Sequence, residues 1–349
     1  MNRPVLFALP GSEALAQPLS AALDAEVGTI EHRQFPDGET YLRVGNDVSD
    51  REVILLSSLD HPDAKLLPLL FAAATARDLG ARRIGLVAPY LAYMSQDIRF
   101  YAGAAVTSRT FAAILSRHLD WLVTVDPHLH RYHELSEIYR IPTQVVHAAP
   151  FLASWIKRNV ARPLIIGPDL ESEQWVSQVA ADADAPFLVC EKIRSGDRHV
   201  TISIPNAPAF LYRQPVLVDD IASSGRTLTE AARQLVGMGF ARPDCVVVHP
   251  LFAGDAAQVL GGLVERIVST NAVAHASNDI DVMPAIAEAV RRPRRRRDVP
   301  PCGVAATCLL AASPRRATFR RRRDVPPRGI ASMRLFRPFS RRLRDPPFR

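Results

Sequence analysis

The sequence predicts an α/β protein with two tandem domains, each a mainly parallel sheet flanked by helices. Short apolar runs rich in Val, Ile and Leu alternate with longer segments in which apolar residues recur at helical spacing. This alternation is typical of parallel sheets covered on both faces. It occurs twice, so we expect one domain over residues 1–145 and another over 146–290, alike in element order but not in sequence.

In the first domain, apolar runs predict strands at 5–9, 53–56, 84–88 and 121–125, with helices at 14–23, 65–79 and 107–119. Pro36-Asp37-Gly38 predicts a tight turn. Residues 89–106 follow a strand but are long and rich in polar and aromatic side chains. Long loops after strands are usually functional, so we expect this one to contribute to a site.

In the second domain, the same reasoning predicts strands at 164–166, 187–190, 200–204, 216–218, 246–248 and 266–269, with helices at 171–181 and 228–236. We expect the charged segment 191–199 to be a loop that precedes the predicted strand at 200–204. Gly237 and Gly239 are expected to end the second helix.

Residues 216–228 carry the clearest sign of chemistry. A buried strand is expected to end at Asp219 and Asp220, and a Ser/Gly turn then leads into a helix. The N-terminus of a helix exposes free N–H groups and favours an anion. We therefore expect a sugar phosphate, with its phosphate in loop 223–227 and its sugar against the two carboxylates. The alternative is an ordinary strand–helix unit with solvated acids.

Other acidic and histidine side chains also follow predicted strands. Asp126 and His128 follow one strand, and Asp169 follows another. Ligands of open parallel sheets bind at the carboxyl ends of strands. Mg²⁺ takes one or two carboxylates together with phosphate oxygens and waters, so this edge suits a magnesium-dependent reaction on phosphates.

The net charge of +7 conceals two different regions. Residues 291–349 hold 19 arginines and three aspartates, a formal charge of +16, whereas the remaining residues carry −9. This tail is rich in Arg and Pro and repeats the string Arg-Arg-Arg-Arg-Asp-Val-Pro-Pro, so we expect it to be disordered. The acidic body excludes specific nucleic-acid binding by the whole protein, and only the tail would bind polyanions, without sequence preference.

Further features indicate a cytoplasmic protein. No apolar run approaches the ~20 residues that span a bilayer, so no membrane association is expected. The N-terminus begins with a strand and lacks the layout of a signal peptide. The four cysteines have neither paired nor metal-type spacing, which indicates reduced thiols.

Six motifs in order carry a family resemblance. The 219–227 segment resembles the phosphoribosyl-diphosphate loop of type I phosphoribosyltransferases, although Arg226 stands where many members have Gly. With residues 35–39, 89–97, 126–128, 168–169 and 192–194 it resembles the ribose-phosphate diphosphokinase family over about residues 4–290. The resemblance implies two phosphoribosyltransferase-type domains. It also implies transfer of the diphosphoryl group of Mg-ATP to the 1-hydroxyl of ribose 5-phosphate, with release of AMP.

The resemblance also implies residue roles. Lys192 and Arg194 would be catalytic, stabilising charge on the transferring group, and His128 and Asp169 would hold Mg²⁺. ATP would be bound by six residues: Phe35, Asp37, Glu39, Gln96, Asp97 and Arg99. Ribose 5-phosphate would be bound by seven: Asp219, Asp220, Ser223, Ser224, Gly225, Arg226 and Thr227. A homo-oligomer is implied, with an active site shared between subunits.

Two positions depart from the family pattern. Ser95 and Ala104 stand where members usually have Arg and often Glu. Loss of an Arg removes a bidentate phosphate contact that Ser cannot replace. This departure keeps open a catalytically weak, regulatory or structural homologue that associates with an active synthase. A phosphoribosyltransferase is the third alternative, although the intact 35–39 and Lys192 motifs argue against it.

Overall fold

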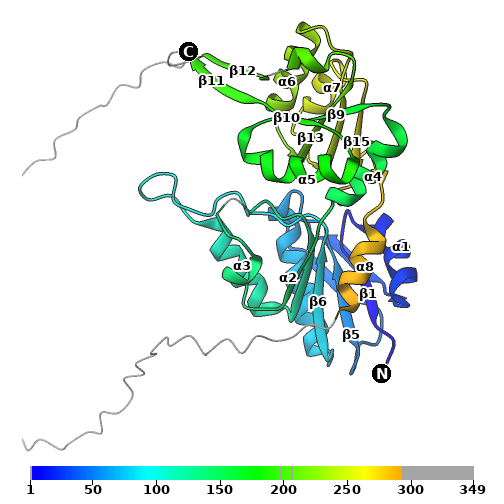
Figure 1. Ribbon diagram of the computed structural model, residues 1–349. Helices are drawn as coiled ribbons and strands as arrows, with labels where there is room; N and C mark the ends of the chain where they lie inside the picture. The colour runs from blue at the N-terminus through cyan, green and yellow to red at the C-terminus, as the bar shows by residue number, and fades with distance from the viewer. Residues whose placement is uncertain (1, 130, 196–198, 206, 293–349) are drawn as a thin grey trace, which may run out of the picture. The chain divides into compact units, whose positions relative to one another are not determined.

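A computed structural model describes residues 2–129, 131–195, 199–205 and 207–292 of the protein. The predicted fold class is confirmed: two six-stranded sheets, in which every paired strand is parallel, are flanked by helices (Figure 1). The predicted disordered tail lies outside the described residues from residue 293 onward. No helix of the described ranges is long and apolar enough to span a membrane.

The first sheet has the strand order β2-β1-β5-β6-β7-β8. Its strands are β1 (Val5–Ala8), β2 (Glu26–Val27), β5 (Glu52–Leu56), β6 (Arg83–Ala88), β7 (Trp121–Val125) and β8 (Thr143–Val146). Successive side chains of a strand point to opposite faces, so Leu6 and Phe7 enter different core clusters. Helix α1 (Ala16–Leu23) covers the Leu6 face, whereas α2 (Pro62–Asp78) and α3 (Thr107–His118) cover the Phe7 face.

The second sheet has the order β10-β9-β13-β14-β15-β16. Its strands are β9 (Pro163–Gly167), β10 (Phe187–Val189), β13 (Gln214–Ala222), β14 (Asp244–Pro250), β15 (Arg266–Thr270) and β16 (Asn278–Ile280). Helices α4 (Ala149–Asn159) and α5 (Glu173–Ala183) pack on the face of Val216 and Val218. Helices α6 (Arg226–Gly237) and α7 (Ala256–Gly261) pack on the opposite face, with Leu217.

Several elements differ from the sequence prediction, and helices α4 and α7 and strands β2, β8 and β16 were not predicted. Residues 191–195 form a strand in place of the predicted loop: β11 (Glu191–Ser195) pairs antiparallel with β12 (His199–Ser203). The Pro36-Asp37-Gly38 turn connects a second antiparallel pair, β3 (Ile30–Gln34) and β4 (Thr40–Val44), which lacks long apolar runs and was missed. The predicted strand over 216–218 extends to Ala222, because its hydrogen-bonded ladder with β14 continues past the two aspartates.

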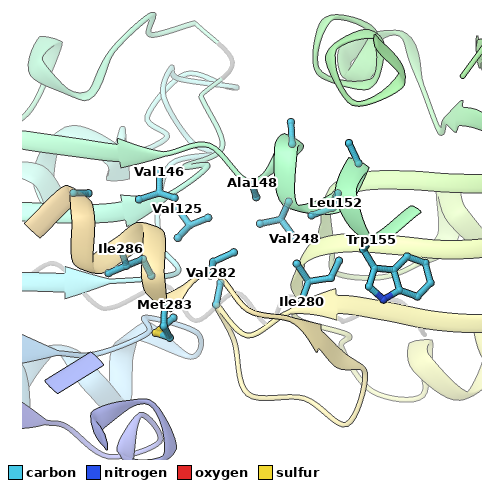
Figure 2. Packing of buried hydrophobic residues seen from close by; sticks show 14 of the residues in the cluster. Val125, Val146, Ala148, Leu152, Trp155, Val248, Ile280, Val282, Met283 and Ile286 are labelled. Atoms are coloured by element: carbon cyan, nitrogen blue, oxygen red, sulfur yellow. The ribbon is translucent and has the colours of Figure 1, made fainter. Parts of the chain in front are cut away.

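The last helix, α8 (Met283–Arg291), also escaped prediction, and it includes Arg291, the first residue assigned to the tail. It packs against α1, β7 and β8, and Arg291 donates to the carbonyl of Ala22. One continuous hydrophobic cluster joins residues of both sheets with α8 (Figure 2). The domain boundaries at 145 and 290 therefore stay predictions, since the second half of the chain returns to pack on the first sheet.

Close packing of the first sheet depends on Gly85 of β6. Gly85 pairs with Trp121 of β7, and a Cβ at residue 85 would lie 1.7 Å from an indole carbon of Trp121. Trp121 is fully buried, and its indole nitrogen donates to Glu52 at 3.0 Å. The ring is therefore fixed and has no room to withdraw.

We predict that Gly85→Ala lowers the free energy of unfolding by about 1–3 kcal/mol, because overpacking forces the surrounding structure to shift. Urea unfolding followed by circular dichroism measures this change. Gly237→Ala, in α6 with no atom within 4 Å of an added Cβ, is the control and is expected to be neutral or stabilising by up to about 1 kcal/mol. Equal stability of the two variants would contradict the packing argument.

Candidate active site

Strand β13 and helix α6 place the strongest candidate residues. Gly225 has φ +65° and precedes the first residue of α6, Arg226. A glycine adopts this left-handed conformation without strain, so the chain can turn at once from strand to helix. The turn is held by backbone hydrogen bonds from Phe252 to the carbonyl of Ala222 (2.8 Å) and from Ala253 to that of Ser223 (3.0 Å). The free N–H groups at the start of α6 are thereby fixed.

The two aspartates of β13 have different protonation preferences. Burial, reinforced by the nearby carboxylates of Asp220 and Asp169, raises the pKa of Asp219 well above its usual range. Burial opposes ionisation of Asp220 as well, yet the pKa of Asp220 is lowered by its hydrogen bond with His128 and by that ring's charge. The two carboxyl groups therefore differ in proton affinity, and Asp220 ionises more readily than Asp219.

His128 reaches this pair from the first sheet. Its Nδ1 lies 2.5 Å from Oδ2 of Asp220. The structure thus joins a residue predicted to bind a metal, His128, with one predicted to bind ribose, Asp220. Asp126, at φ +29°, turns the chain after β7 toward His128. A carboxylate oxygen of Asp126 accepts from the backbone N–H of Ala148 at 2.8 Å, just before α4.

His249 supports this arrangement and was missed by sequence reasoning. It is fully buried in β14, and its Nε2 lies 3.1 Å from the carbonyl oxygen of Val125 and 3.3 Å from that of Asp126. Burial lowers the pKa of His249, so the ring is neutral and donates from Nε2. The sequence signal that marks it is a histidine at the carboxyl end of an apolar run, the pattern also seen for His128.

Asp169 follows β9 and caps a short 3₁₀ turn. Its Oδ1 accepts from the backbone N–H of Ser172 at 3.3 Å, and its carbonyl accepts from the Ser172 hydroxyl at 2.6 Å. Across the described ranges, no group of three His, Cys, Asp or Glu residues has an arrangement suited to a metal ion. The assignment of His128 and Asp169 to Mg²⁺ stays a prediction.

The loop after β6 contains the predicted nucleotide residues. Gln96 accepts from the Thr107 hydroxyl at 3.1 Å, which holds the loop to the first turn of α3. Asp97 is only 1% exposed, and its Oδ1 accepts from Arg131 at 2.6 Å. Arg99 donates to the carbonyl of Ala104 at 2.6 Å. Asp97 and Arg99 therefore stabilise the loop itself, and direct contact of either with ATP stays a prediction.

The remaining predicted residues lie on the two antiparallel hairpins. Phe35 is 39% exposed beside the β3–β4 turn, and the Arg33 guanidinium lies 4.7 Å from its ring centroid. Asp37 accepts from the backbone N–H of Glu39 at 3.1 Å, and both acids are exposed. Lys192 and Arg194 lie on β11, opposite Ile202 and Val200 of β12.

This fold, with a carboxylate pair leading into a Ser/Gly turn at a helix N-terminus, defines a phosphoribosyltransferase-fold protein. The comparisons agree. Residues 4–118 match the family model for the N-terminal domain of ribose phosphate pyrophosphokinase, and residues 134–259 match the phosphoribosyl transferase domain. The crystal structure of phosphoribosylpyrophosphate synthetase from Mycobacterium smegmatis shares the fold. Its TM-score is 0.73 at 21% identity, with 83% of this chain and 98% of that chain covered.

Curated relatives give the family. The chain is 33% identical to the ribose-phosphate pyrophosphokinase of Saccharolobus solfataricus, covering 79% of this chain and 96% of the relative. It is 31% identical to that of Methanothermobacter thermautotrophicus, covering 82% of this chain and the whole relative. The chain belongs to the ribose-phosphate pyrophosphokinase family and is an enzyme of that class.

We predict that Arg131→Met destabilises the protein by about 1.5–3 kcal/mol, the usual worth of a hydrogen bond to a charged group, because the buried carboxyl group of Asp97 loses its hydrogen-bond partner. Asp97→Asn in the same chain should restore most of the loss, and a double-mutant cycle in urea measures the coupling. Arg43→Met, which removes an exposed pair with Glu31 at 3.6 Å, is the control and should change stability by under about 0.5 kcal/mol. A coupling energy near zero would contradict this assignment.

Proposed function

We propose that this protein transfers the diphosphoryl group of Mg-ATP to the 1-hydroxyl of ribose 5-phosphate, giving phosphoribosyl diphosphate and AMP. The observation that carries the proposal is the sequence of groups along β13 and α6. Two aspartates of different pKa, Asp219 and Asp220, are followed directly by the Gly225 turn at the N-terminus of a twelve-residue helix.

Each group has a distinct part in binding ribose 5-phosphate. The N–H groups at the start of α6 and the hydroxyls of Ser223, Ser224 and Thr227 are donors for the 5-phosphate, and the helix dipole adds attraction for its charge. Asp220, as a carboxylate, accepts hydrogen bonds from ribose hydroxyls. Asp219, whose pKa is raised by burial, holds its proton more tightly than Asp220 and so adds less negative charge beside the phosphates.

Mg²⁺ would be held by Asp169 and His128, together with oxygens of the substrate phosphates. The donor set fits a hard cation that keeps several waters and takes few protein ligands. When bound, the ion neutralises negative charge on the polyphosphate. The chain's own contribution is to orient His128 through its hydrogen bond with Asp220.

The nucleotide would be bound by the β3–β4 turn of a neighbouring subunit. Phe35 presents an exposed ring suited to stacking on adenine, and the exposed carboxylates of Asp37 and Glu39 suit the amino edge of the base. A simple tight turn would not explain an aromatic ring flanked by two acids. This turn therefore supports a homo-oligomer in which subunits share active sites. We place the protein in the cytoplasm, because reduced thiols are expected there.

Lys192 and Arg194, on the β11–β12 hairpin, would stabilise negative charge on the transferring phosphoryl group, which is usually the largest contribution in phosphoryl transfer. The deciding experiment measures AMP formation from ATP and ribose 5-phosphate by the full chain. AMP formation that Lys192→Ala greatly reduces, with little change in either KM, supports the proposal. No AMP formation supports the regulatory homologue, and nucleobase-dependent consumption of phosphoribosyl diphosphate supports a phosphoribosyltransferase.

We predict that Gly225→Val raises the KM for ribose 5-phosphate at least tenfold, with a much smaller effect on the KM for ATP. A side chain here is strained at φ +65° and its Cβ would lie 3.4 Å from that of Ala256, so it distorts the phosphate loop. Gly239→Val, at φ +94° beyond the other end of α6 with open space around it, is the control for backbone strain. Equal changes in both KM values would refute the assignment.

We predict that Ser95→Arg raises kcat/KM for ATP by about one to two orders of magnitude, since a hydrogen bond to a charged group contributes ~1.5–3 kcal/mol. Arg99 already donates to Ala104, so it is not expected to supply this charge. Steady-state kinetics of Ser95→Arg beside Ser95→Gln test the prediction. If Ser95→Arg leaves kcat/KM for ATP unchanged and Arg99→Ala abolishes activity, the contact with the ATP phosphates belongs to Arg99 and the prediction is wrong.

A further inference from the structure

Two loops meet at the carboxyl edge of the first sheet. One follows β6 and contains Asp97, and the other follows β7 and contains Arg131. β6 and β7 are neighbouring parallel strands, and the backbone N–H of Val125, at the end of β7, donates to the carbonyl of Pro89 just after β6 at 3.2 Å. Ligands of open parallel sheets bind at this edge, so side chains fixed between the two loops are placed to meet a substrate.

Arg131 is held at this junction by Asp97. Its Nη1 donates to Oδ1 of Asp97 at 2.6 Å, and the Asp97 side chain is fully buried. The next residue, Tyr132, donates from its hydroxyl to the carbonyl of Asp97 at 3.3 Å and accepts from Nε of Arg109 at 3.1 Å. One short segment therefore holds both the side chain and the backbone of Asp97, and Arg131 cannot leave without breaking a hydrogen bond to a buried carboxyl group.

Most of the Arg131 guanidinium remains available to a ligand. The Arg131 side chain is 53% exposed although its partner is buried. In the part of the chain that the structure describes, only Nη1 of Arg131 forms a hydrogen bond, and Oδ2 of Asp97 has no partner, so the pair has a single contact. A guanidinium has five N–H donors in a rigid fork that matches phosphate oxygens. Arg131 thus presents a positive charge and several donors at the surface.

Two other cations that follow the carboxyl ends of β5 and β6 are already engaged. Lys65 is only 15% exposed and forms an ion pair with Asp60 at 2.6 Å. Arg99 donates to the carbonyl of Ala104 at 2.6 Å. Phosphoryl transfer depends on positive groups that neutralise the polyphosphate, and Arg131 is a cation at this edge that is both fixed and exposed.

We propose that Arg131 is a substrate-binding residue that contacts the polyphosphate of ATP. It lies three residues beyond His128, which the proposed function places beside the substrate phosphates. The phosphate of ribose 5-phosphate is a less suitable ligand, because its proposed site is the N-terminus of α6 on the second sheet. The inference rests on the proposed function, since it takes this edge as the ATP site. The alternative is that Arg131 only stabilises the loop through Asp97.

The test separates these two roles by neutralising the partner first. Asp97→Asn is the reference, and Asp97→Asn with Arg131→Met lacks the arginine without leaving a buried carboxyl group unpaired. The full-length proteins are titrated with Mg²⁺ and α,β-methylene-ATP, whose diphosphoryl group cannot be transferred. The Kd should be about tenfold or more higher in the double variant, the usual worth of a hydrogen bond to a charged group. Adenosine, which has no phosphate, should bind both proteins alike.

Arg266 provides a matched control. It pairs with the buried Asp244 at 2.7 Å and its side chain is 42% exposed, but the two residues begin β15 and β14 at the amino edge of the second sheet. Asp244→Asn with Arg266→Met should bind α,β-methylene-ATP as tightly as Asp244→Asn alone. A loss of affinity equal to that of the Arg131 variant would mean that breaking any such pair weakens binding, and would overturn the proposal.

Chemical modification tests the native chain without a substitution. Phenylglyoxal modifies accessible arginines, and α,β-methylene-ATP should protect the peptide that contains Arg131 whereas adenosine should not. Arg266 should react equally with and without the nucleotide. An unprotected Arg131, or equal affinity of Asp97→Asn with and without Arg131→Met, overturns the proposal. Absence of AMP formation in a protein that still shows this protection would refute the proposed function and support the assignment of Arg131.

Discussion

The alternation of side chains along β13 is the constraint on which the candidate active site depends. β13 is hydrogen-bonded to β9 as far as Leu217 and to β14 as far as Ala222, so the ladder with β14 fixes its backbone at the two aspartates. Adjacent residues must point to opposite faces. Asp219 therefore shares the face of Leu217, near Cys245, and Asp220 shares the face of Val218, near His128. Two neighbouring carboxylates acquire opposite protonation preferences because the sheet places them in different surroundings.

This difference has a functional consequence. Two ionised carboxylates beside a sugar phosphate would repel the anion that the α6 N-terminus attracts. Burial, together with the carboxylates of Asp220 and Asp169, raises the pKa of Asp219, whereas the hydrogen bond with His128 lowers the pKa of Asp220. In the proposed site, Asp220 is then the more readily ionised acceptor for ribose hydroxyls.

The connection between the two sheets explains why His128 can reach Asp220. The hydrophobic cluster in Figure 2 contains Val125 and Val146 from the first sheet, Val248 and Ile280 from the second, and Val282 and Met283 at the start of α8. Within it, the neutral ring of His249 donates to the carbonyl of Val125. This buried polar contact fixes the end of β7, and the carboxylate of Asp126 fixes the start of α4. The apolar contacts bury the junction between the two sheets. The hydrogen bonds of His249 with Val125 and of Ala148 with Asp126 fix the position of the segment that carries His128.

The sequence by itself determined the fold class and the main candidate segment, because both rest on local patterns. Apolar runs specify buried parallel strands, and the Ser223-Ser224-Gly225 turn is typical of a connection from a strand to a helix. It could not reveal β3 or β4, whose residues are exposed or only partly buried and largely polar, since antiparallel hairpins of this kind lack an apolar pattern. Tertiary structure alone decided the pairing of His128 with Asp220, the burial of Asp97 against Arg131 and the role of His249. These contacts join residues 34 to 124 positions apart, and separation of that kind leaves no periodic signal in a sequence.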